Sequence, residues 1–193
     1  ISLVSVVVIT FYLLLDKEKF ENLATSFFVG QQDKIRRLID RVEEKLGYWL
    51  RGQLVLSLAV GTMIYIGLTL LGIDYALPLA IIAGLLEVVP VIGPLISAIP
   101  GILVALTISP VMGAMVTGLY LLVQQVESHV MVPQIMKRAV GLNPILVILA
   151  VSVGSKLLGI GGALLAVPIA VVIQVVLEEI LSGPSAKALE IKD

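Results

Sequence analysis

The sequence has no cysteine, a single histidine and few charged residues. Lys, Arg, Asp and Glu together make up 14% of the 193 residues, and aromatic side chains 5%. The lack of cysteine excludes disulfides, thiolate metal sites and cysteine catalysis. A soluble domain has about a quarter of its residues charged, so the composition argues against a soluble domain. The net charge of −1 predicts no nucleic-acid partner.

What the sequence has in excess is apolar residues. They make up 59% of the chain, and the mean hydropathy is +1.09. Several apolar runs approach the length of about 20 residues that a helix needs to cross a bilayer. We therefore expect an all-α, polytopic membrane bundle.

The first fifteen residues, 1–15, are apolar and follow no basic segment, which excludes a signal peptide. Fifteen helical residues reach about 22 Å, less than the roughly 30 Å hydrocarbon core. We expect them to be the C-terminal part of a transmembrane helix whose start lies outside this chain.

Residues 16–50 differ sharply in composition from their surroundings. Eight of the thirteen Lys and Arg residues fall between Asp16 and Arg51, among seven acidic residues. Apolar residues recur at helical spacing from Asp33 onward, which predicts an amphipathic helix. Mixed charges favour a helix packed on the protein over a membrane-surface anchor. The positive-inside rule makes this segment cytoplasmic.

Residues 51–182 are predicted to be the transmembrane core. Gly72 should end its first helix, Asp74 can cap the next, and Ser109 and Pro110 should start another. The tail 183–193 is polar and should be cytoplasmic. The predicted order within the core is a helix at 51–72, a re-entrant hairpin at 76–106, a helix at 110–132 and a second hairpin at 143–182, which turns at the GIGG sequence of residues 159–162.

The first hairpin interrupts an apolar run that extends from Leu77 to Ile108. Proline removes a backbone donor and clashes with the preceding turn, so no straight helix should pass through its centre. Legs of about fourteen residues are too short to cross twice, which predicts re-entry from the outer side. The residues expected to form the break are Pro90, Gly93, Pro94 and Pro100, with Glu87 beside them.

The two hairpins show weak internal similarity. A shift of 68 residues places Gly93 on Gly161, Pro94 on Gly162 and Pro100 on Pro168. The charge pattern has the first hairpin entering from outside and the second from inside. Two like units of opposite orientation are the plan of an alternating-access carrier, and we expect an inverted repeat.

Glu87 is the first candidate for function. A carboxylate at membrane depth faces a cavity or a partner in most membrane proteins, although a carboxylate that accepts backbone donors at a helix end is the alternative. A second candidate is the polar stripe on the helix before Pro133, which should face the protein interior. It consists of Thr117, Tyr120, Gln124, Glu127 and Ser128.

Two further ionisable residues have plainer interpretations. His129 is expected at the surface or in a cap, and Lys156 is expected to extend to the outer interface, with pairing to Glu87 as its alternative. No Ser, His and acid set, metal-ligand cluster or phosphate loop occurs in the sequence. We therefore expect no cofactor, no metal and no enzymatic activity.

Four stretches together resemble the AI-2E family of bacterial transporters, the autoinducer-2 exporter or PerM-like permeases. The resemblance covers residues 1–182, and members of that family are longer at the N-terminus. The stretches are RGQ at 51–53, LLEVVPVIGPLISAIP at 85–100, QQVESHVMVPQIMKRAVGLNP at 124–144 and GIGGALLAVP at 159–168.

The resemblance implies a multi-pass protein of the bacterial inner membrane that forms a homo-oligomer, expected as a pentamer. It implies export of a small polar solute such as the quorum-sensing signal autoinducer-2, or exchange of Na⁺ or Li⁺ for H⁺; a scaffold that transports nothing is the alternative from another class. From the residues and the resemblance together, the residues expected in binding or gating are Glu87, Pro90, Gly93, Pro94, Pro100, Gln124, Glu127, Gly161, Gly162 and Pro168, followed by Tyr120, Pro133, Asn143 and Lys156. Lys156 is not part of the family pattern, so a role for it would be specific to this chain.

Overall fold

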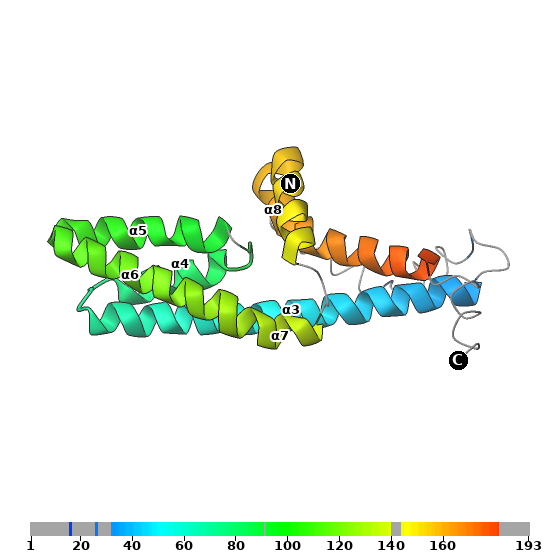
Figure 1. The fold of residues 1–193 in the computed structure, drawn as a ribbon, viewed down its shortest axis with the longest axis horizontal. Helices are drawn as coiled ribbons and strands as arrows, with labels where there is room; N and C mark the ends of the chain where they lie inside the picture. Colours follow the sequence, from blue (N-terminus) through cyan, green and yellow to red (C-terminus); the bar gives the residue numbers. More distant parts are fainter. Residues whose placement is uncertain (1–15, 17–25, 27–31, 91, 140–143, 182–193) are drawn as a thin grey trace. The chain divides into compact units, whose positions relative to one another are not determined.

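The computed structural model describes residues 16, 26, 32–90, 92–139 and 144–181. Every regular element in these ranges is helical (Figure 1). The chain divides into two compact units, one of Ile1–Glu44 with Gln174–Asp193 and the other of Lys45–Ile173. The helices are α3 (Gln32–Leu70), α4 (Ala76–Leu86), α5 (Ile92–Ile108), α6 (Pro110–Val126), the π-helix η1 (Glu127–Met131), α7 (Val132–Ala139) and α8 (Pro144–Leu181).

Helix α3 joins two segments that the sequence analysis treated separately. The predicted amphipathic helix from Asp33 and the predicted helix at 51–72 are parts of one helix of 39 residues. Gly47 does not interrupt it, because glycine lowers helix stability by only about 1 kcal/mol and no proline lies within the helix. The buried residues of α3 follow one face at helical spacing: Trp49, Gly52, Gln53, Leu56, Val60, Ile64 and Leu68.

The end of α3 is as predicted, but the start of α4 is not. Gly72 has a φ of 74°, and the Ile73 N–H donates to the Leu68 carbonyl at 3.0 Å, which closes the helix end. The predicted cap Asp74 is wrong: Tyr75 is the N-cap residue of α4, and no side chain makes a cap hydrogen bond there.

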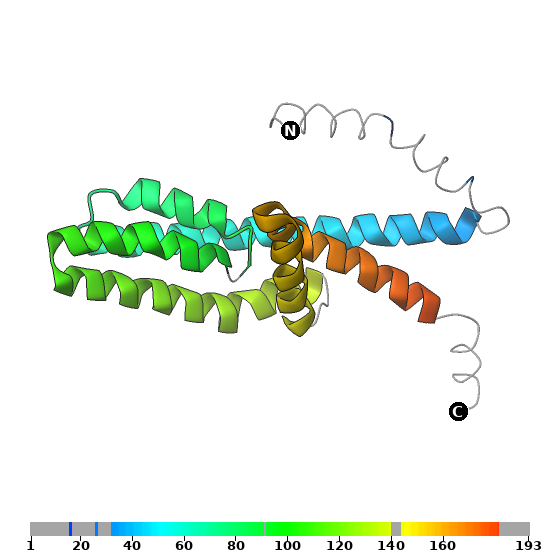
Figure 2. The ribbon, with the colours of Figure 1, turned by 90° about the horizontal axis from the view of Figure 1, so that it is seen from above.

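Helices α4, α5 and α6 form a meander beside the C-terminal half of α3 (Figures 1 and 2). The turn before α6 follows the prediction, because Ser109 caps the helix by accepting a hydrogen bond from the Met112 N–H at 3.0 Å. The core of this group contains Ile64, Leu68, Ala83, Ala105 and Val116. Many large apolar side chains point outward, including Leu58, Leu70, Leu95 and Leu103. Such an exterior suits lipid better than water.

The helix that was predicted to end near Val132 continues to Ala139. Pro133 therefore lies inside a helical stretch, at the second residue of α7. The π-helical turn η1 immediately precedes it. A proline ring clashes with the carbonyl four residues earlier in a regular α-helix, and the wider π turn displaces that carbonyl.

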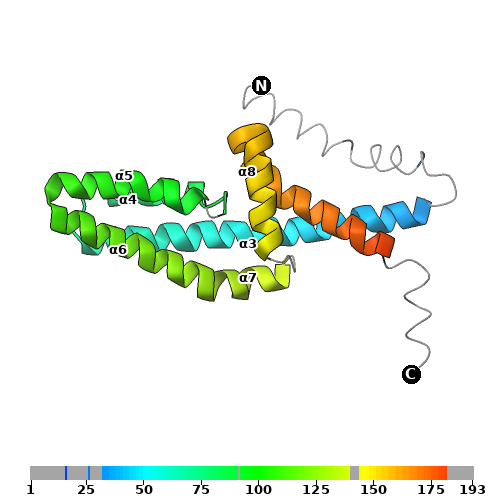
Figure 3. The same ribbon diagram turned by 45° about the horizontal axis from the view of Figure 1, so that its top comes forward.

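Helix α8 is a bent pair of helical legs (Figure 3). Gly159 has a φ of 62° and a ψ of −139°, so the chain leaves the helical conformation at the first residue of the predicted GIGG turn. Two described helical segments are long and apolar enough to cross a membrane, Gln32–Leu70 and Gly161–Glu179; the shorter apolar helices are Ala76–Leu86, Ile92–Ile108 and Ile145–Gly159.

Candidate functional site

The break between α4 and α5 is shorter than the sequence predicts. Only residues 87–91 separate the two helices, and Pro94 lies in the first turn of α5, where a missing N–H removes no helical hydrogen bond. Pro100 lies inside α5, so its predicted part in the break is wrong. The chain nevertheless reverses where Glu87 and Pro90 were expected to interrupt it.

Glu87 is the C-cap residue of α4 and is only 1% exposed. Its Oε2 atom is buried and has no hydrogen-bond partner. The free groups at a helix C-terminus are carbonyls, which do not stabilise a carboxylate. The alternative role for Glu87, a carboxylate that accepts backbone donors at a helix end, is therefore not supported by this geometry.

A second buried carboxyl group faces Glu87 across the helices. Glu127 is 6% exposed, and its carboxyl group lies near that of Glu87. Gln124, one turn earlier, donates from Nε2 to Glu127 Oε2 at 3.3 Å. The site thus places an acid at the C-terminal end of α4 close to an acid on η1.

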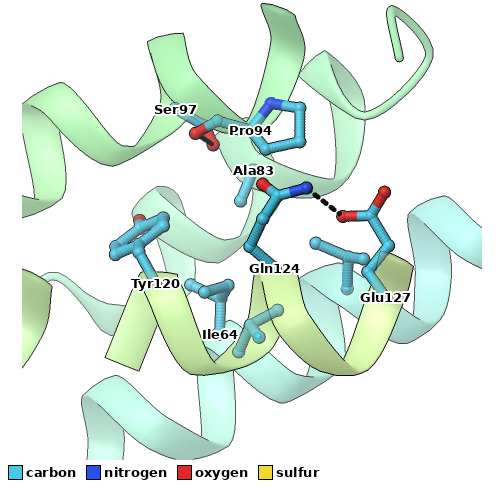
Figure 4. Close-up of a pocket in the computed structure, with 9 residues that line it drawn as sticks. Ile64, Ala83, Pro94, Ser97, Tyr120, Gln124 and Glu127 are labelled. Carbon is cyan, nitrogen blue, oxygen red and sulfur yellow. Dashed lines mark hydrogen bonds between the residues drawn. The ribbon is translucent and has the colours of Figure 1, made fainter. Parts of the chain in front are cut away.

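A small cavity lies beside Glu127 (Figure 4). Its walls include Pro94 and Ser97 from α5, Tyr120 and Gln124 from α6, and Glu127 from η1. About 10 Å³ is open to the centre of a water-sized sphere, which is room for one water molecule and not for an organic solute. The Tyr120 hydroxyl is buried and has no partner, so the cavity contains an unused polar group.

Much of the predicted polar stripe does face the interior. Tyr120 and Glu127 are buried, and Thr117 and Gln124 are partly buried. Ser128 is exposed, which corrects its predicted inward position; its hydroxyl donates to the Gln124 carbonyl. His129 is exposed, as expected for a surface residue.

The second hairpin has its own close contact. A β-carbon added to Gly162 would overlap the carbonyl oxygen of Gly154, so the two legs touch there. Gly161 and Lys156 are exposed, and Pro168 is partly buried within the second leg. Within the described residues, no ion pair joins Lys156 to Glu87. The pairing that was predicted as the alternative role of Lys156 is therefore not observed.

The predicted residues thus separate into two groups. Glu87, Pro94, Tyr120, Gln124 and Glu127 come together at the first break, with Pro90 and Gly93 in the adjoining turn. None of the described second-hairpin residues lines the cavity, Pro133 is exposed beyond η1, and Asn143 lies outside the described residues.

Sequence reasoning missed two buried polar residues. Ser97 is 2% exposed and donates to the Pro94 carbonyl at 2.9 Å. Gln53 is 3% exposed and donates from Nε2 to the backbone carbonyl of Glu87 at 2.6 Å. Gln53, Ser57 and Gly61 lie four residues apart and form a stripe of polar and small residues on an apolar helix. This stripe could have indicated that Gln53 is buried.

Comparison with known proteins agrees with the resemblance seen in the sequence. The family model described as "AI-2E family transporter" matches residues 1–182. "Putative transport protein YrrI" of Bacillus subtilis is 35% identical over 136 residues, 70% of this chain and 38% of that protein. "AI-2 transport protein TqsA" of Escherichia coli is 30% identical over 152 residues, 78% of this chain and 44% of that protein.

"Putative permease PerM" of E. coli is 28% identical over 192 residues, 97% of this chain and 54% of that protein. The chain spans about half the length of the curated relatives it matches. The family consists of membrane transporters and not of enzymes. With the match extending over nearly all of its length, the chain belongs to the AI-2E transporter family.

Proposed function

We propose that this protein is part of a secondary transporter that exports a small polar solute, such as autoinducer-2 or a similar molecule, by alternating access. The observation that carries the proposal is the buried Glu87 and Glu127 pair at a helix break. Two carboxyl groups inside an otherwise apolar bundle are costly, and in membrane proteins such groups mark pathways for ions and substrates. The relative TqsA bears the name of an AI-2 transport protein, which supports the choice of solute.

The two hairpins share one structural feature that supports alternating access: a close contact between a glycine and a main-chain carbonyl beside the turn. In the first, a β-carbon on Gly93 would overlap the Leu86 carbonyl oxygen; in the second, one on Gly162 would overlap that of Gly154. The shift of 68 residues relates Leu86 to Gly154 and takes Gly93 to the residue beside Gly162. We interpret the hairpins as an inverted repeat that re-enters from opposite leaflets and moves against the remaining helices.

One observation favours a second candidate, an Na⁺(Li⁺)/H⁺ antiporter. The cavity beside Glu127 has room for one water molecule, and two buried carboxyl groups lie close together there. A site of this size fits proton or small-cation exchange directly, whereas an organic solute would need the hairpins to separate first. A non-transporting scaffold remains the alternative from another class.

Vesicles containing the full-length protein test these proposals. Export requires flux of the autoinducer-2 signal. Glu87→Gln and Glu127→Gln should each reduce this flux by at least about tenfold, because each variant removes a buried group that can bind a proton or a cation. Glu44→Gln is the matched control, because Glu44 is exposed on α3. Sodium-driven proton movement without signal flux would select the antiporter. No flux of either kind, with both variants indistinguishable from the parent, would select the scaffold.

The same proposal places the protein in the bacterial cytoplasmic membrane, with the charged end of α3 and the C-terminus on the cytoplasmic side. A homo-oligomer, expected as a pentamer, is part of this proposal. Cysteine accessibility at exposed positions on α3 and α8 would test the orientation.

A further inference from the structure

Gln53 makes an unusual contact at the end of α4. Its side-chain amide crosses from α3 and donates to the backbone carbonyl of Glu87 at 2.6 Å, between residues 34 apart in sequence. Gln53 itself is 3% exposed. The buried amide of Gln53 donates to the main-chain carbonyl of Glu87 and not to a carboxyl group. This choice of acceptor needs a physical explanation.

The explanation lies in the last turn of α4. The Val88 N–H donates to the Leu85 carbonyl at 3.4 Å, and the Val89 N–H donates to the Leu86 carbonyl at 3.0 Å. These bonds join each residue to the third one after it. The next carbonyl in the series is that of Glu87, and the residue in position to donate is Pro90, which has no N–H.

We propose that Gln53 is a positioning residue, which supplies the donor that Pro90 lacks and thereby holds the Glu87 turn so that its carboxyl group meets Glu127. A buried carbonyl without a partner is costly, so the turn would otherwise move to find water or another donor. Fixing this one carbonyl fixes the residue that carries the acid. The functional meaning of the position rests on the transporter proposal; the hydrogen bond and its effect on Glu87 do not.

Chemical modification of Glu87 reports its position without requiring transport. A lipid-soluble carbodiimide reacts with protonated carboxyl groups in apolar surroundings, and peptide mass spectrometry identifies the modified residue in the full-length protein. Gln53→Met keeps the length of the side chain and removes the amide. We expect labelling of Glu87 to fall roughly fivefold in this variant, because the loss of one hydrogen bond releases the turn to water.

Two further variants separate positioning from general destabilisation. Ser57→Ala removes a buried hydroxyl without a partner one turn further along α3, and it should leave labelling as in the parent. Adding Pro90→Ala to Gln53→Met restores a backbone donor at residue 90 and should recover at least about half of the lost labelling. A merely structural role for Gln53 gives no reason for such recovery.

The outcomes are distinct. Equal labelling of Glu87 in the parent and in Gln53→Met overturns the proposal, as does a double variant that labels no better than Gln53→Met. Thermal unfolding of the same proteins is the second measurement: the effects of Gln53→Met and Pro90→Ala should be non-additive, and additive effects would overturn it. If the parent transports nothing but the labelling pattern is found, the transporter proposal fails and the role of Gln53 stands.

Discussion

The carbonyl oxygen of Leu86 and the α-carbon of Gly93 touch so closely that no β-carbon can stand at residue 93. The contact brings the C-terminal end of α4 against the first turn of α5 and fixes the width of the first hairpin. Gly154 and Gly162 make the corresponding contact across the bend of α8. In both hairpins, backbone meets backbone beside the turn, and close packing of this kind is how helices associate in an apolar environment.

The first prediction concerns this contact. Gly93→Ala and Gly162→Ala should each destabilise the protein by about 1–3 kcal/mol, because a methyl group must displace main-chain atoms. Thermal unfolding in detergent measures the effect. Gly118→Ala is the matched control, since a β-carbon there meets nothing within 4 Å; it should leave stability unchanged or raise it slightly. Equal midpoints for all three variants would contradict the contact.

The sequence predicted helix ends well where one local residue decides them. Gly72, Ser109 and Gly159 act through their own backbone or side chain, and the structure ends or starts a helix at each. The continuity of α3 through Gly47 could not be predicted, since an isolated glycine costs too little to break a helix. The helix through Pro133 was missed because a π turn accommodates that proline.

The candidate site was predictable in part for the same reason. Glu87 and Glu127 are acids within apolar runs, which marked each as a candidate, but the sequence did not indicate that the two lie beside each other. Gln53 was missed because its partner is a main-chain carbonyl 34 residues away. Its importance depends on the missing N–H of Pro90, which becomes apparent only when both helices are seen together.

The second prediction concerns Gly101 and Tyr120. A β-carbon on Gly101 would lie 2.8 Å from both Cε2 and the hydroxyl oxygen of Tyr120, so Gly101→Ala should push the ring toward the cavity and cost about 1–3 kcal/mol. Replacing Tyr120 with Leu should relieve that clash, so Gly101→Ala should cost less in the Tyr120→Leu background. A double-mutant cycle by thermal unfolding measures this coupling; strictly additive effects would show that the two residues do not press on each other.

The third prediction concerns the Tyr120 hydroxyl alone. It is buried without a partner, so Tyr120→Phe should leave thermal stability unchanged or raise it, by up to about 1 kcal/mol. The same variant should impair transport if the hydroxyl binds water or solute when the site is loaded. A large loss of stability in Tyr120→Phe would mean that the hydroxyl already has a partner in the resting protein.

The fourth prediction concerns an ion pair between the ends of two helices. Arg41 on α3 lies 2.8 Å from Glu179 on α8, with side chains 50% and 24% exposed. Because solvent screens such a pair, Arg41→Ala should cost less than about 1 kcal/mol, and the cost should shrink further at high salt. The charge-reversed double variant, Arg41→Glu with Glu179→Arg, should recover stability lost in either single reversal. Failure to recover would show that Arg41 and Glu179 do not pair in the folded protein.

The fifth prediction concerns the π turn that carries Glu127. If Pro133 forces the turn by excluding the carbonyl four residues earlier, Pro133→Ala should allow residues 127–131 to relax into a regular α-helix. The relaxation would rotate the residues on one side of the turn by about 100° relative to the other, the angle of one α-helical residue. The directions in which Glu127 and Gln134 point would then change relative to each other. Cysteine accessibility at Gln134 and Ile135 should exchange, Gln134 being exposed and Ile135 partly buried in the parent. An unchanged pattern would show that packing, and not Pro133, maintains the π turn.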